Sequence, residues 1–183
     1  AAIAKLKDIE GSNLIKRNRI FTDMLQSGIE VSWYDGVEDH NDIVRLIDFE
    51  QPETNTFHVV NQWTFIERGT NKRPDVIVFI NGLPLVLFEL KSPSRAEADS
   101  EDAYQQIQNY KKQIPTLFAY NMFCVISDMA QTRFGTITAT ESRFVEWKSV
   151  DGAYVDNRHA DWKTPLDGIF PKARLVDILK NFV

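Results

Sequence analysis

The chain has 183 residues, of which 43% are hydrophobic and 26% charged, so its composition excludes an intrinsically disordered chain and its length predicts one domain. The net charge of −5 provides no global positive field for nucleic acid, so any DNA contact must be local or supplied by a partner. Cys124 is the single cysteine, which excludes an intrachain disulfide and a cysteine zinc site. The chain has no run of about 18 apolar residues and no apolar signal-peptide core, so we expect a soluble, cytoplasmic protein without membrane contact.

The first third of the chain predicts a helix followed by strands. Apolar residues at helical spacing between Leu14 and Leu25 predict a helix that ends at the breaker Ser27-Gly28. The strands expected next are Ile29 to Tyr34, Val44 to Ile47 and Phe57 to Ile66.

Two apolar runs joined by Asn81-Gly82 predict a β-hairpin. Val76 to Ile80 and Leu85 to Phe88 are nearly continuous apolar runs, as expected of strands buried on both faces of a covered sheet. Asn-Gly is the strongest short-range hairpin signal, because a type I′ turn needs positive φ at both central residues. The two strands are therefore expected to pair.

Three charged side chains lie at the open end of this hairpin: Asp75, Glu89 and Lys91. Glu89 and Lys91 share a face, because side chains alternate along a strand. Burying two carboxylates and an ammonium costs several kcal/mol unless the groups neutralise one another or hold a cation. A divalent metal is therefore the expected occupant, and a structural ion cluster is the alternative.

The second half of the chain predicts a helix between strands. Ser92-Pro93-Ser94 should end the strand that carries Lys91, and a helix should begin near Asp99 to Asp102 and end before Pro115. Further strands are expected at Met122 to Ile126 and Thr136 to Ala139, and a final amphipathic helix at Ala173 to Phe182. This order predicts an α/β sheet with a crossover connection.

Gln106 and Tyr110 lie four residues apart on the predicted helix and therefore neighbour each other on its surface. As a polar pair, they are candidates for a site next to the hairpin. Tyr110 also belongs to an apolar stripe with Ala103, Ile107 and Ile114, which favours a core residue with a polar tip. Both interpretations remain open at this point.

These residues resemble the motifs of the PD-(D/E)xK nuclease superfamily. The matching motifs are Pro74-Asp75, Glu89-Leu90-Lys91 and Q-x-x-x-Y from Gln106 to Tyr110. Nearly the whole chain is similar to the N-terminal nuclease region of the restriction subunit of type I restriction-modification enzymes. The further segments that carry this similarity are Val44 to Phe49, Val60 to Gln62, Asn81 to Val86, Ile114-Pro115, Val125 to Asp128 and Trp147-Lys148.

The resemblance implies an α/β restriction-endonuclease-like core, with a mixed central β-sheet flanked by α-helices. It implies one nuclease domain over residues 1–183, with the core motifs in 57–128 and a C-terminal extension in 129–183 that leads toward a motor. It also implies a type I site-specific deoxyribonuclease that cuts double-stranded DNA together with methyltransferase and specificity subunits. ATP would drive translocation in the full-length subunit and bind elsewhere, because this chain has no G-x-x-x-x-G-K-[ST] loop.

The resemblance also implies roles for individual residues. Mg²⁺ would be held by Asp75, Glu89 and the backbone carbonyl of Leu90. Lys91 would orient the attacking water or stabilise charge on the phosphate. The residues expected to hold the DNA backbone or the catalytic elements are Gln106 and Tyr110.

Two other functions compete with this one. A docking module that has lost catalysis would show no Mg²⁺ or Mn²⁺ site at Asp75 and Glu89. A stand-alone repair nuclease with the same core would lack a helicase fused after Val183.

Overall fold

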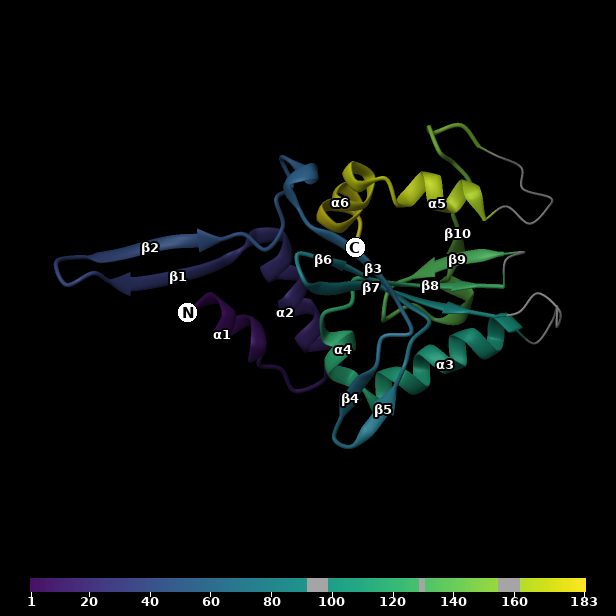
Figure 1. The fold of residues 1–183 in the computed structure, drawn as a ribbon, viewed down its shortest axis with the longest axis horizontal. Helices are drawn as coiled ribbons and strands as arrows, with labels where there is room; N and C mark the ends of the chain where they lie inside the picture. The colour runs from purple at the N-terminus through teal and green to yellow at the C-terminus, as the bar shows by residue number, and fades with distance from the viewer. Residues whose placement is uncertain (92–98, 129–130, 155–161) are drawn as a thin grey trace.

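A six-stranded mixed sheet forms the centre of the molecule, with helices on both faces (Figure 1). The computed structural model describes residues 1–91, 99–128, 131–154 and 162–183. The expected α/β fold with a flanked, mixed central sheet is confirmed. No helix in these four ranges is long and apolar enough to cross a membrane.

Two helices and a hairpin precede the central sheet. Helix α2 begins after Asn13, whose side chain accepts a hydrogen bond from the Lys16 amide at 2.9 Å, and ends before Gly28, where φ is +88°. The elements are α1 (Ala2–Lys7), α2 (Leu14–Ser27), β1 (Ile29–Tyr34) and β2 (Asp39–Val44). The predicted helix before Ser27-Gly28 and the predicted strand at Ile29 to Tyr34 are confirmed.

The strand expected at Val44 to Ile47 is wrong, because β2 ends at Val44. Beyond that point the backbone bonds to side chains rather than to another strand. The Leu46 carbonyl accepts from the Asn81 side chain at 2.9 Å, and the Asp48 amide donates to the Asn55 side chain at 2.9 Å. Ile47 contributes to the core from this bend and is 1% exposed.

In the central sheet the strand order is β10-β9-β8-β7-β6-β3. Its strands are β3 (Phe57–Asn61), β6 (Val76–Ile80), β7 (Leu83–Leu90), β8 (Phe123–Ser127), β9 (Thr132–Gly135) and β10 (Val145–Glu146). Within this sheet β7 and β8 are parallel, and the crossover between them contains α3 (Asp99–Gln113) and α4 (Pro115–Ala119). The predicted crossover is thus confirmed. Ser92-Pro93-Ser94, expected to end β7, lies outside the described residues.

The hairpin predicted from Asn81-Gly82 is confirmed. Asn81 and Gly82 have φ angles of +50° and +82°, as a type I′ turn requires. Strands β6 and β7 pair antiparallel on either side of this turn. The Asn81 side chain also accepts a hydrogen bond from the Thr56 amide at 2.8 Å, which ties the turn to the start of β3.

Of two other predicted strands, the first has the wrong bounds and the second is a turn. The strand expected from Phe57 to Ile66 is interrupted at Gln62, where φ is +52°, and the chain continues into a separate hairpin of β4 (Phe65–Glu67) and β5 (Thr70–Lys72). Residues Thr136 to Ala139 form a turn after β9 instead of a strand, because the Ala139 amide donates to the Thr136 carbonyl at 3.0 Å. Ile137 is buried from that turn.

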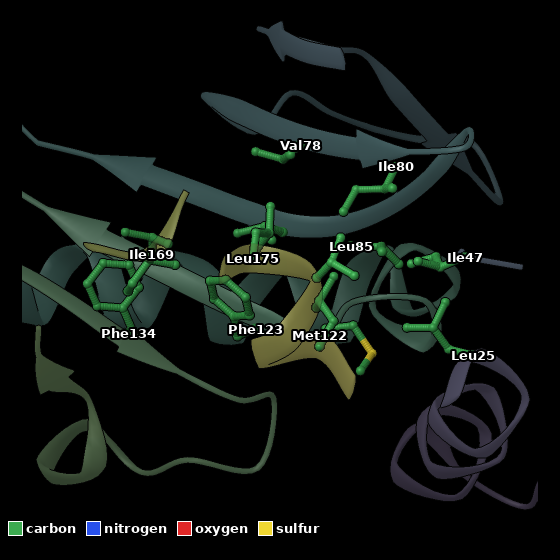
Figure 2. Close-up of a cluster of buried hydrophobic side chains, with 14 of the residues drawn as sticks. Leu25, Ile47, Val78, Ile80, Leu85, Met122, Phe123, Phe134, Ile169 and Leu175 are labelled. Carbon is green, nitrogen blue, oxygen red and sulfur yellow. The ribbon is translucent and has the colours of Figure 1, made fainter. Parts of the chain in front are cut away.

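The two faces of the sheet carry separate hydrophobic clusters. One cluster joins the sheet to α2, α5 (Lys163–Ile169) and α6 (Lys172–Asn181), and Figure 2 shows part of it, including Phe123 and Leu175. The second joins the opposite face to α3 and α4. Because α3 is packed onto this second face, it covers the side of β7 from which Leu87 and Glu89 project.

Candidate active site

Asp75 and Glu89 lie opposite each other at the open end of the β6–β7 hairpin. Val76 pairs with Phe88 in antiparallel register, so the adjoining residues, Asp75 and Glu89, project from the same face of the sheet. The backbone amide of Leu90 donates to Asp75 Oδ2 at 2.9 Å, which fixes one carboxylate oxygen against β7. The structure therefore brings the two predicted carboxylates together.

Gln62 holds the second oxygen of Asp75. Its side-chain amide donates to Asp75 Oδ1 at 2.8 Å, and its backbone amide donates to the Asp75 carbonyl at 2.8 Å. Although Gln62 falls within a segment of the family resemblance, the sequence assigned it no role. The signal that identifies Gln62 is the antiparallel register of β3 and β6, in which Asn61 pairs with Val76.

The Glu89 carboxylate is buried and only partly satisfied. The residue is 4% exposed, and its Oε1 accepts a hydrogen bond from Lys91 Nζ at 3.0 Å. Its Oε2 is buried without a hydrogen-bond partner among the described residues. Burial raises the pKa of this carboxyl to about 6, with the Asp75 charge acting in the same direction and Lys91 and the Tyr110 hydroxyl acting against it. An incoming cation would relieve this unfavourable arrangement.

Lys91 is positioned by the end of β7. Its side chain is 27% exposed and projects from the same face as Glu89, as the alternation along the strand predicts. Its backbone amide donates to the Ser127 carbonyl at 2.8 Å, which anchors the residue beside β8. The ammonium is thus placed at the carboxylates while remaining accessible to solvent.

Tyr110 reaches the same site from α3. It is 5% exposed and belongs to the buried stripe of Ala103, Ile107 and Ile114, so the core interpretation holds for its ring. Its hydroxyl is nevertheless influenced by the site. Burial raises the pKa of this hydroxyl, and a hydrogen bond from Gln106 lowers it. The charges of Glu89 and Asp75, and a hydrogen bond to the Glu89 carboxylate, raise it further. Gln106 and Tyr110 therefore form a polar pair next to the carboxylates.

The protein groups available to a metal here are few. Within the described ranges, no cluster of three or more His, Cys, Asp or Glu residues could hold a metal ion. Two carboxylates are sufficient for Mg²⁺, which keeps several waters and commonly binds one or two protein carboxylates. The donor set of Asp75 and Glu89 therefore fits a hard cation, and the Leu90 carbonyl stays the predicted third ligand.

Comparison with known proteins gives one consistent result. The family described as type I restriction enzyme R protein N terminus matches residues 1–143. The chain is 39% identical, over 93% of its length and 17% of the relative, to the type I restriction enzyme HindI endonuclease subunit of Haemophilus influenzae. It is 34% identical, over 69% of its length and 12% of the relative, to the SauCOLORF180P endonuclease subunit of Staphylococcus aureus. The chain thus spans less than a fifth of the length of these relatives.

Proposed function

Because the chain belongs to the family of type I restriction enzyme R protein N-terminal domains, we propose that it is the nuclease domain of such a subunit and hydrolyses phosphodiester bonds of double-stranded DNA with Mg²⁺. The observation that carries this proposal is the buried Glu89 carboxylate beside Asp75 and Lys91, whose Oε2 has no hydrogen-bond partner within the part of the chain that the structure describes. A docking module that never bound metal would bury this carboxylate next to Asp75 with the Lys91 ammonium as the neutralising charge for both. The nuclease is therefore the better-supported function.

Asp75, Glu89 and the Leu90 carbonyl would hold the metal. When bound, Mg²⁺ lowers the pKa of a coordinated water and offsets charge on the phosphate. The hydrogen bonds from Gln62 and Leu90 orient both oxygens of Asp75 before any ligand arrives. Such orientation of a ligating carboxylate by its neighbours lowers the reorganisation needed for binding.

Three side chains would act on the substrate: Lys91, and Gln106 and Tyr110 of α3. The Lys91 ammonium, 3.0 Å from Glu89 Oε1, can donate to the attacking water or to the phosphate oxygens as their charge grows. Gln106 is partly exposed, so its amide can contact the DNA backbone while it supports the Tyr110 hydroxyl. In the full-length subunit, ATP-driven translocation and the methyltransferase and specificity subunits would deliver the DNA.

Metal binding tests this proposal directly. We expect Mn²⁺, followed by electron paramagnetic resonance, to bind the protein, and Asp75→Asn or Glu89→Gln to weaken that binding strongly, because each change removes a charged oxygen ligand. Asp23→Asn is the matched control, since Asp23 is an exposed acid on α2. Equal Mn²⁺ affinity in Asp75→Asn and wild type would rule out this site and favour the docking module.

Gln62 offers a second, smaller test. We expect Gln62→Ala to weaken Mn²⁺ binding by about 10- to 100-fold, the usual effect of removing a group that orients a metal ligand. The backbone hydrogen bond from residue 62 to Asp75 is retained in this variant, so the fold should persist. The control is Asn61→Ala, an exposed neighbour on β3. If both variants bind Mn²⁺ like wild type, the Gln62 side chain does not position Asp75.

A further inference from the structure

The β1–β2 hairpin projects away from the body of the molecule (Figure 1). Large apolar side chains on its outer part face solvent: Trp33 is 48% exposed, Tyr34 64% and Val37 84%. Isolated exposed apolar residues are ordinary, but a projecting element that concentrates them is typical of an interaction surface.

One face of the hairpin carries most of the apolar residues of β1 together with Asp42, the partner of Val31, and is only partly covered. Directly paired residues share a face, so Ile29 and Val31 lie on the same side as the Trp33–His40 pair. Ile29 and Val31 are buried at the base, where β1 meets the body. Farther out, the rings of Trp33 and His40 stack with centroids 5.2 Å apart, with Trp33 exposed and His40 half-buried. The apolar face therefore continues beyond the part that the body covers.

Hydrogen bonds of Asp35 define the turn of the hairpin. Asp35 Oδ1 accepts from the Val37 amide at 2.8 Å and from the Glu38 amide at 2.9 Å, and its Oδ2 contacts His40 Nε2 at 2.8 Å. Gly36 supplies the positive φ of +100° that this turn needs. A two-stranded hairpin is marginally stable alone, so these contacts reduce the entropy that a partner would have to offset on binding.

Charge is segregated onto this element. Five of the chain's 26 acidic residues and none of its 21 lysines and arginines lie between residues 29 and 44, so the remainder carries 21 of each sign. The acidic residues are Glu30, Asp35, Glu38, Asp39 and Asp42. The net charge of the whole chain therefore resides on the hairpin. Such a surface repels phosphate backbones. The rest of the chain has no net positive charge, so a second copy offers no net complementary charge for the hairpin to bind.

We propose that the β1–β2 hairpin docks this domain onto a basic, partly apolar surface of another protein subunit of the restriction complex. This inference rests on the proposed function for the identity of the complex, and on the charge and exposure of the hairpin for the chemistry of the contact. The Trp33–His40 pair on one face and Tyr34 on the other supply aromatic anchors, a residue class that dominates interface energetics. The carboxylates around them select a positive partner surface and speed encounter with it.

The experiment measures association of the full-length subunit with the purified methyltransferase–specificity complex of the same restriction system, by biolayer interferometry at low and high salt. Trp33→Ala and Tyr34→Ala should each weaken the affinity by about tenfold or more. The double variant Asp39→Asn and Asp42→Asn should slow association at low salt and flatten its salt dependence. This charge variant preserves side-chain shape, so it stays informative even if Trp33→Ala disturbs the hairpin.

Matched variants outside the hairpin control for general effects. Tyr154 is 70% exposed, so Tyr154→Ala removes a comparable aromatic side chain, and Glu10→Gln with Asp23→Asn removes the same charge. These controls should associate like wild type. Wild-type affinity and salt dependence in all hairpin variants would overturn the proposal, as would hairpin variants that change only DNA binding or self-association of the subunit.

The Asp75→Asn variant, assayed for both association and DNA cleavage, separates this inference from the proposed function. Asp75→Asn should assemble like wild type, because Asp75 lies at the carboxylate site and not on the hairpin. If Asp75→Asn still cuts DNA, the proposed function fails. The association results for the hairpin variants would still test the hairpin proposal, because they do not depend on cleavage.

Discussion

Alanine at Asp75, Glu89 or Lys91 of the full-length subunit should abolish DNA cleavage while ATP hydrolysis and translocation survive. Each change removes a metal ligand or the ammonium from the hydrolytic site, whereas ATP chemistry needs a phosphate-binding loop that this chain lacks. The loss should exceed about 10²-fold, because electrostatic and metal contributions of this kind are worth several kcal/mol at the transition state.

The measurement is linearisation of a plasmid with one recognition site, run beside ATP turnover and triplex displacement as a record of translocation. Asp23→Ala, at an exposed position on α2, controls for the loss of a carboxylate. Persistent cleavage by the Glu89→Ala subunit would contradict the assignment. A parallel loss of ATPase in all three variants would indicate that the triplet supports folding or assembly instead.

Lys91→Ala needs one additional check. Lys91 supplies the hydrogen bond at Glu89 Oε1, so its removal leaves a buried carboxylate with still fewer partners. Such a change destabilises a fold as well as a reaction. The unfolding free energy of Lys91→Ala should therefore be measured before its cleavage rate is interpreted as chemistry.

The parts of this site that the sequence could predict follow from local rules. Asn81-Gly82 specifies a turn by its own backbone preferences, and the turn determines that β6 and β7 pair. Alternation along β7 then places Glu89 and Lys91 on one face. Neither step requires knowledge of any distant part of the chain.

The parts that the sequence could not predict depend on distant contacts. Gln62 meets Asp75 because β3 pairs with β6, and nothing in the residues around Gln62 specifies that neighbour. The end of β2 at Val44 is likewise determined by side chains of Asn55 and Asn81 that lie later in the chain. For Tyr110 the sequence left two interpretations open, a site residue and a core residue. Both hold, because the ring packs in the core while the hydroxyl is directed to the carboxylates.

Glu89→Gln should stabilise the metal-free protein at neutral and alkaline pH. In the folded state burial raises the pKa of Glu89 from its ordinary value of 4.5 to about 6. Between these two values the folded protein binds more protons than the unfolded chain, so the unfolding free energy falls as pH rises through this window. The penalty is complete above about pH 6 and amounts to about 2 kcal/mol, since one unit of pKa corresponds to about 1.4 kcal/mol. A glutamine carries no charge and avoids this penalty.

Urea unfolding in the presence of a chelator measures the effect. The variant should exceed wild type by about 1 to 2 kcal/mol at a pH of about 8. This advantage should shrink as the pH falls and disappear below 4.5, where the Glu89 carboxyl becomes mostly protonated in both states. Addition of Mn²⁺ should then stabilise wild type and leave Glu89→Gln unchanged, because a ligand that binds only the folded state raises its stability. A variant less stable than wild type at alkaline pH without metal would show that Glu89 supports the fold as a charged group. The predicted reversal between the two conditions would instead identify Glu89 as a residue that lowers stability in exchange for metal binding.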